Sequence, residues 1–231
     1  MENNIKKIVD ISKIKILNNN KNEINNENID LIFKIILVGE SSTGKTSIIN
    51  KAINDYIPDS HQVTIGIEYF MMLFEILENK VRLNIWDTCG QEVYRSIINS
   101  FYNNTSLAVI VFAINDLSSF ENVEYWISEI KKNSYPGIRL FLVGNKSDLE
   151  IERTVNKEII DNLIFKYNID YYIETSAKDG NKILDLFKTI TLFLYDDYLY
   201  YKERIHLYNE RKSYYLDRET ITEKKEKNCF C

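Results

Sequence analysis

Short apolar runs alternate with amphipathic stretches along most of the chain, beginning at Leu31. Polar or glycine-containing segments bound each run, and the stretches between them place apolar residues at helical spacing. This alternation is typical of parallel strands that are joined by crossover helices. The expected strands are Leu31–Val38, Ile67–Ile76, Val81–Trp86, Leu107–Ile114, Ile138–Val143 and Tyr171–Ile173.

Only Glu78-Asn79-Lys80 separates the second run from the third, which predicts a hairpin turn there. The hairpin would give the sheet one antiparallel edge strand. The first crossover helix is expected over Ser47–Asn54. The pattern therefore predicts an α/β fold with a six-stranded, mostly parallel sheet, one antiparallel edge strand, and helices on both faces.

The two ends of the chain differ from this central pattern. Residues 1–30 are rich in asparagine and would bury too little apolar surface to offset the entropy of ordering, so we expect a mobile N-terminal extension. Residues 31–198 are expected to form one domain. Apolar residues recur at helical spacing from Ile183 to Tyr208, so the final helix is expected to run past the sheet into a variable tail, residues 199–231.

The segment between the first strand and the first helix carries the clearest candidate chemistry. It reads Gly39-Glu40-Ser41-Ser42-Thr43-Gly44-Lys45-Thr46, with Ser47 next. Two glycines let successive backbone N–H groups point at a polyphosphate, and the helix offers its N-terminal end to the same anion. Lys45 is placed to reach the outer phosphates, and the Thr46 hydroxyl to bind magnesium. The sequence predicts a phosphate-cradling P-loop.

A second candidate motif, Asp87-Thr88-Cys89-Gly90-Gln91-Glu92, directly follows the third strand. Ligands of parallel sheets bind beyond the carboxyl ends of the strands, where this motif and the P-loop would meet. Asp87 can hold magnesium there, directly or through a water, and Gly90 can give its N–H to a γ-phosphate. Gln91 can orient an attacking water.

Two further motifs follow later strands and indicate which base is bound. They are Asn145-Lys146-Ser147-Asp148 and Glu174-Thr175-Ser176-Ala177-Lys178. A carboxylate at Asp148 can accept two hydrogen bonds from guanine, and adenine offers no such pair. Asn145 can tie the loop to the purine, the Lys146 stem can cover its face, and the Ala177 N–H can reach the guanine carbonyl. A guanine nucleotide is therefore predicted, and an adenine-specific ATPase or kinase is disfavoured.

Composition argues against several other classes of protein. The net charge of −5 gives no electrostatic footprint for nucleic acid, so no nucleic-acid partner is expected. Two histidines and three cysteines suggest neither a zinc cluster nor a disulfide framework. No apolar run approaches the roughly 20 residues of a membrane span. We expect a soluble chain of a reducing compartment unless a lipid is attached.

These motifs resemble those of the small Ras-like GTPases and, within them, of the Rab family. The resemblance covers Leu31 to Tyr195, and a weaker similarity points to the Rab subgroup that acts at the Golgi. The most Rab-like runs are Thr64-Ile65-Gly66-Ile67-Glu68-Tyr69, Trp86-Asp87-Thr88, Tyr94-Arg95-Ser96-Ile97 and Phe101-Tyr102.

The resemblance implies a monomer that binds GTP or GDP with Mg²⁺, and meets an exchange factor, an activating protein, effectors and a prenyl-binding escort. It also implies that Thr64 closes over magnesium when the γ-phosphate is present. Tyr69, Trp86 and Phe101 match the aromatic trio that Rab proteins show to effectors, although partial core packing explains each of them about equally well.

The last residues, Cys229-Phe230-Cys231, resemble the Rab ending in which both thiols receive geranylgeranyl groups. A C-a-a-X box is absent, because Asn228 stands where its cysteine would be. The resemblance therefore implies a lipid-anchored protein on the cytosolic face of an intracellular membrane, with Golgi or endosomal vesicles as candidates, and a cytosolic pool.

Some residues depart from the family pattern and leave two functions open. Cys89 stands where alanine is usual, and Ser42 and Thr43 stand where smaller or apolar residues are usual. One hypothesis is a slow GTP hydrolase that acts as a membrane-traffic switch, with water held by Gln91 and the Thr64 carbonyl. The other is a nucleotide-bound scaffold that has lost turnover. The retention of Gln91 and Thr64 favours the hydrolase.

Overall fold

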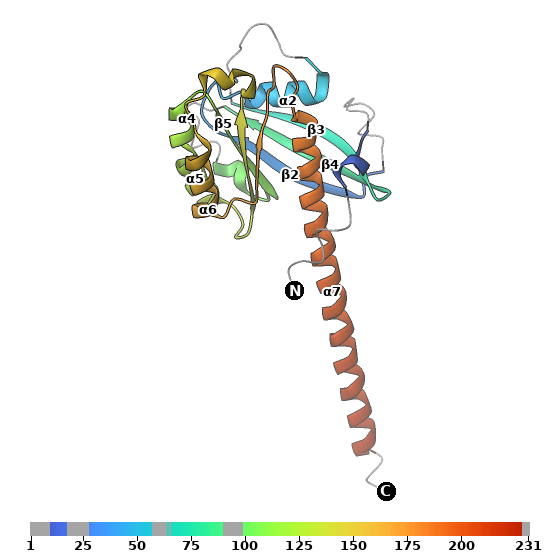
Figure 1. The fold of residues 1–231 in the computed structure, drawn as a ribbon. Coiled ribbons are helices and arrows are strands. Elements are labelled where there is room, and N and C mark those ends of the chain that lie inside the picture. The colour runs from blue at the N-terminus through green and yellow to red at the C-terminus, as the bar shows by residue number, and fades with distance from the viewer. Residues whose placement is uncertain (1–9, 18–27, 57–63, 65, 90–98, 228–231) are drawn as a thin grey trace.

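A computed structural model of the protein describes residues 10–17, 28–56, 64, 66–89 and 99–227, with side chains of the last helix as far as Ile205. Within these ranges a twisted sheet carries helices on both faces, and one long helix continues well beyond the sheet (Figure 1). None of the described helices is long and apolar enough to cross a membrane.

The described sheet has seven strands, in the spatial order β1-β3-β4-β2-β5-β6-β7. Pairings β1–β3 and β3–β4 are antiparallel, and all others are parallel. The mostly parallel α/β class is confirmed, but the predicted count of six strands is wrong. The strands are β1 (Lys15–Ile16), β2 (Leu31–Val38), β3 (Ile67–Ile76), β4 (Asn79–Thr88), β5 (Leu107–Ala113), β6 (Arg139–Asn145) and β7 (Tyr171–Glu174).

The additional strand comes from the N-terminal segment. A short 3-10 helix, η1 (Ile11–Lys13), leads into β1, which pairs outside β3 and so displaces β3 from the sheet edge. Between them Ile14 is only 1% exposed. The prediction of a mobile extension is therefore wrong for residues 10–17. The apolar surface that covers Ile14 belongs to distant elements, so the composition of the segment gave no sign of it.

The helices lie where the crossover pattern predicts them. Helix α2 begins two residues before its expected start, at the end of the glycine loop, and α7 extends past the sheet as predicted. The helices are α2 (Lys45–Asn54), α4 (Leu117–Glu121), α5 (Val123–Asn133), α6 (Lys157–Tyr167) and α7 (Ile183–Lys227), with 3-10 turns η3 (Asn99–Tyr102) and η4 (Ser147–Glu152).

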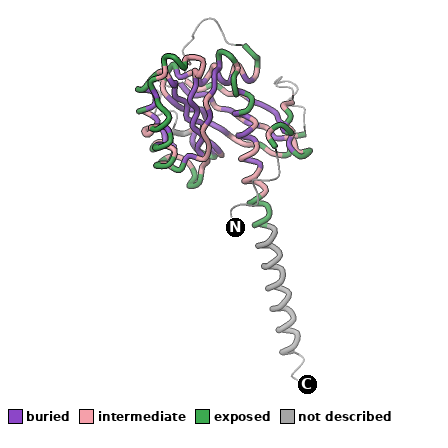
Figure 2. The backbone as a smooth tube through the Cα atoms, viewed as in Figure 1, coloured by how far each residue is buried: buried purple, intermediate pink, exposed green. Residues whose placement is uncertain are grey.

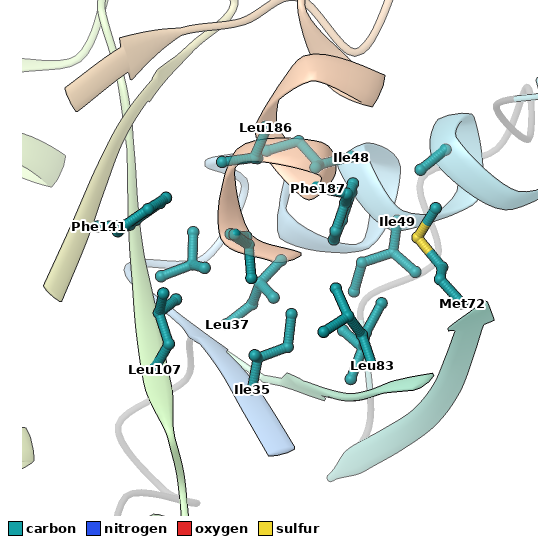
Figure 3. Close-up of a cluster of buried hydrophobic side chains, with 14 of the residues drawn as sticks. Ile35, Leu37, Ile48, Ile49, Met72, Leu83, Leu107, Phe141, Leu186 and Phe187 are labelled. Atoms are coloured by element: carbon teal, nitrogen blue, oxygen red, sulfur yellow. The ribbon is translucent and has the colours of Figure 1, made fainter. Parts of the chain in front are cut away.

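The core is divided by the sheet into two apolar layers. On β2, Ile35 and Leu37 face the layer under α2 and α7, whereas Ile36 and Val38 face the layer under α4, α5 and α6. Figure 2 shows the buried strands as the centre of the molecule, and Figure 3 shows Leu37 among side chains of α2 and α7. Strands apolar on both faces are what a parallel sheet covered by helices requires. This packing fixes the carboxyl ends of β2, β4, β5 and β6 relative to one another.

The hairpin between β3 and β4 turns on Leu77 and Glu78, one residue earlier than predicted. Both residues have positive φ, at 45° and 65°. A two-residue loop of this kind matches the twist of the paired strands. Asn79, expected in the turn, is instead the first residue of β4.

Candidate functional site

The loop after β2 requires glycine at two positions. Gly39 has φ +140°, and a Cβ there would lie 2.1 Å from the backbone oxygen of Val111. Gly44 has φ +93°, and a Cβ there would lie 2.3 Å from Nδ2 of Asn145. Strands and loops distant in the sequence thus press against both glycines. The predicted P-loop conformation depends on these close approaches.

The first turn of α2 has no side-chain cap. Gly44 occupies the N-cap position without a side-chain hydrogen bond. Two other helices are capped, since Asp116 accepts from the Ser119 N–H at α4 and Asn156 accepts from the Ile159 N–H at α6. The free N–H groups at the start of α2 therefore remain suited to an anion.

Lys45, the first residue of α2, folds back over the loop. Its Nζ donates to the backbone oxygens of Gly39 and Glu40, each at 2.8 Å. Burial lowers the pKa of Lys45 to about 8, although the nearby carboxylates of Asp87 and Glu40 oppose that shift. The described hydrogen bonds of this buried ammonium group go to neutral carbonyls, and phosphate oxygens would satisfy it better.

Three oxygen-bearing side chains meet beside Lys45. The Thr46 hydroxyl donates to Oδ2 of Asp87 at 2.5 Å and lies 2.8 Å from the Thr64 hydroxyl. Asp87 is fully buried, and its Oδ1 has no hydrogen-bond partner in the described part of the chain. Burial raises the pKa of Asp87 to about 6. The predicted metal residues Thr46, Thr64 and Asp87 therefore form one cluster, with a buried oxygen that lacks a partner.

Asn145 joins the loops on either side of the site. Its Nδ2 donates to the Thr43 carbonyl at 2.9 Å, and its Oδ1 accepts from the Thr175 hydroxyl and the Ala177 N–H, both at 3.2 Å. Asn145 is 2% exposed. The Ala177 N–H, which we expected to face the guanine carbonyl, is thus donated within the protein.

Asp148, the residue predicted to bind guanine through its carboxylate, is held in place by neighbouring side chains. Asp148 Oδ1 accepts from the Ser176 hydroxyl at 2.7 Å, which in turn accepts from the Asp179 N–H at 3.0 Å. Lys178 Nζ lies 4.0 Å from Asp148 Oδ2 but is largely exposed. Lys146, at φ +66°, turns the chain between β6 and η4. These contacts bring the two base motifs together at the carboxyl ends of β6 and β7.

The remaining P-loop residues frame the site. Thr43 is buried and donates its hydroxyl to the Glu40 carbonyl at 2.9 Å, whereas Ser41 and Ser42 are exposed and Ser47 is half-buried. Sequence reasoning missed one contact here: Nε1 of Trp126, on α5, donates to Oε1 of Glu40 at 3.2 Å. No local signal predicts it, because 86 residues separate the two.

The predicted effector residues form a continuous aromatic row. The ring centroids of Tyr69 and Trp86, and those of Trp86 and Phe101, are 5.1 Å apart. All three rings are half-buried, and Trp86 and Phe101 also pack on the core beneath them. Lys34 Nζ lies 5.5 Å from the Trp86 centroid and 5.9 Å from that of Phe101. The row is therefore partly core and partly surface.

Several predicted residues lie outside the described ranges, namely Gly90, Gln91, Cys229 and Cys231. Cys89, the departure beside them, is described: it is buried, and its N–H donates to the Gly66 carbonyl at 3.0 Å. Among the described residues no group of three or more histidine, cysteine, aspartate or glutamate side chains is placed to hold a metal ion.

Comparison with known proteins gives consistent matches across this region. The sequence model of the Ras family matches residues 34–195. Ras-related protein Rab-19 of Rattus norvegicus is 37% identical over 184 residues, covering 80% of this chain and 82% of that protein. Rab-19 of Xenopus laevis is 33% identical over 215 residues, 91% of this chain and 99% of that protein. GTP-binding protein ypt1 of Schizosaccharomyces pombe is 37% identical over 170 residues, 72% of this chain and 81% of that protein.

Proposed function

The chain belongs to the Rab family of Ras-like small GTPases, which hydrolyse GTP, and we propose that it works as a magnesium-dependent, membrane-anchored switch in vesicle traffic. One observation carries the proposal. Lys45, Thr46 and Asp87 converge at the uncapped start of α2, and the buried Oδ1 of Asp87 has no partner among the described residues.

The P-loop is proposed to bind the phosphates of GTP or GDP. The N–H groups between Gly39 and Ser47 supply donors, and Lys45 exchanges its two carbonyl acceptors for phosphate oxygens. Phosphate would also restore the charge balance around the Lys45 ammonium, whose pKa burial now lowers. Binding is therefore expected to be strong for the triphosphate and the diphosphate and weak for the nucleoside.

Magnesium fits the cluster of Thr46, Thr64 and Asp87. The donors are all oxygens, which Mg²⁺ prefers, and Asp87 offers an oxygen without a partner. When bound, the ion would neutralise charge on the phosphates. The Thr46 hydroxyl would turn from Asp87 toward the ion. Thr64 would close over the ion only while the γ-phosphate is present.

Guanine is proposed as the base. Asp148 presents a carboxylate that Ser176 orients, and Asn145 braces the P-loop against the segment that carries Ala177. The Lys146 stem would cover one face of the ring, and Lys178 would lie beside it. The Ala177 N–H would have to leave Asn145 in order to reach the guanine carbonyl.

Hydrolysis is proposed to need little more than positioning. Gln91 and the Thr64 carbonyl would orient the attacking water, while Lys45 and the N–H groups of the P-loop and Gly90 would stabilise the charge that develops on the phosphates. The nucleotide-bound scaffold remains the alternative, and it predicts that replacing Gln91 changes nothing.

The switch output is proposed to run through the aromatic row of Tyr69, Trp86 and Phe101. Tyr69 pairs with Trp86 in the β3–β4 ladder, so a change at the nucleotide end of these strands would reach the row through rigid backbone. An exchange factor, an activating protein, effectors and a prenyl-binding escort are the expected partners. Geranylgeranyl groups on Cys229 and Cys231 would hold the protein on Golgi or endosomal vesicles.

Nucleotide analysis tests the proposal directly. Purified protein should retain guanine nucleotide and magnesium. Asp148→Asn should weaken the binding of GTP and strengthen the binding of xanthosine triphosphate, because an amide pairs better with the xanthine carbonyl than with the guanine amine. Mass analysis of released nucleotide gives the readout, and Asp55→Asn, at an exposed carboxylate, is the control. Adenine nucleotide as the main species would refute the assignment.

A further inference from the structure

The N-terminal segment, residues 10–17, closes the edge of the sheet (Figure 1). In β1, Lys15 pairs with Glu75 and Ile16 with Phe74, and the Leu17 N–H donates to the Leu73 carbonyl at 2.8 Å. An ion pair at 2.8 Å joins Lys15 to Glu75. The segment therefore supplies backbone pairing to the outer side of β3 over residues 73–75.

Side chains of the segment cover both faces of β3. Ile14 lies in the same buried cluster as Ile76 and as Leu194 and Tyr195 of α7, and Ile16 packs against that cluster. On the other face, Leu17 packs against the Met71–Leu73 pair. The segment thus fills the gap between the sheet edge and the last helix. Ile14 and Ile16 pack on one face of the sheet, and Leu17 packs on the other.

This edge has the properties of a site that accepts a strand. Unpaired N–H and C=O groups beside apolar residues on both faces are a template for another polypeptide. The existing contact is short, with a two-residue ladder and an ion pair whose lysine is 71% exposed, so the pair adds little. Ile14 is the most deeply buried side chain of the segment, so it is the anchor that the test removes.

We propose that residues 10–17 are an internal occupant of this strand-accepting edge, and that an extended segment of another polypeptide can pair with β3 only after they leave. The occupant defines the chemistry that the edge accepts: an apolar residue at the position of Ile14, a cation opposite Glu75, then two apolar residues. The edge adjoins the aromatic row, since Tyr69 packs on the same Met71–Leu73 pair as Leu17.

The test uses the full chain and a fluorescent peptide with the sequence of residues 10–17. Ile14→Asp removes the buried anchor, and Ser12→Asp adds the same charge at an exposed position two residues away. Losing one buried isoleucine should raise the open fraction, and with it the apparent affinity for the peptide, roughly 10- to 100-fold. Wild type and Ser12→Asp should bind the peptide equally weakly in an anisotropy titration.

Hydrogen exchange supplies a second readout. Amides of β3 should exchange faster in Ile14→Asp than in Ser12→Asp, while those of β5 and β6 stay protected, which excludes global unfolding. Should Ile14→Asp fail to fold, Ile14→Ala gives the same test with a smaller effect. The proposal is overturned if the Ile14 variant and Ser12→Asp bind the peptide alike, or if β3 opens without gaining affinity for it.

Discussion

Replacing Asn145 by alanine should loosen the junction between the P-loop and the loop after β7. The amide makes three buried hydrogen bonds, to the Thr43 carbonyl, the Thr175 hydroxyl and the Ala177 N–H. At about 0.5–1.5 kcal/mol net for each of the three, their loss should lower the free energy of unfolding by about 1.5–4.5 kcal/mol. In a chain of this size that corresponds to a fall of several degrees in melting temperature.

A double-mutant cycle shows whether these bonds are the cause. Thr175→Val removes only the hydroxyl and should cost about 1 kcal/mol. The double variant with Asn145→Ala should cost about 1 kcal/mol less than the sum of the two, because both remove the same bond. Asn122→Ala, which removes one exposed bond to Ser118, is the matched control and should cost under about 0.5 kcal/mol.

The assay is urea unfolding at a fixed, saturating GDP concentration. Because bound nucleotide adds RT ln(1 + [L]/Kd) to stability, the Kd of each variant is measured and that contribution is subtracted. GDP should also dissociate faster from Asn145→Ala, since the Thr43 carbonyl and the Ala177 N–H lose their common partner. An intrinsic stability of Asn145→Ala within about 0.5 kcal/mol of wild type, or strict additivity in the cycle, would refute this reasoning.

Three further predictions follow from the site and the tail. Intrinsic GTP hydrolysis should proceed on the order of 10⁻⁴ to 10⁻³ per second, and Gln91→Leu should lower it and block stimulation by an activating protein; equal single-turnover rates would favour the scaffold instead. Gly39→Ala should abolish nucleotide retention and sharply destabilise the protein, because its Cβ would lie 2.1 Å from the Val111 carbonyl oxygen; calorimetry and nucleotide analysis would detect both. Cys229→Ser should leave the protein partly cytosolic, and Cys229→Ser with Cys231→Ser fully so, because one lipid gives reversible and two give stable attachment; flotation of the double variant with membranes would contradict this.

Local chemistry made much of the fold predictable from the sequence. The apolar runs located six of the strands to within a few residues, because a strand buried on both faces must be apolar throughout. The glycine loop located the start of α2, because the required positive φ values favour glycine. Motifs that follow strand ends were expected to meet, and Thr46 and Asp87 do meet at 2.5 Å.

Only the tertiary structure decided which of these groups are already engaged. Asn145 looked available to a purine, yet three partners from two distant loops use its amide. Trp126 gave no sign of contacting Glu40, and the raised pKa of Asp87 follows from burial that its neighbours in the chain do not create. Ile14 is the clearest case. Its segment lies in an asparagine-rich stretch, residues 1–30, and Ile14 is buried because β3 and α7, which lie far along the chain, leave an apolar gap that it fills. Sequence determines what each residue can do locally, whereas burial and partners depend on surfaces brought together from far along the chain.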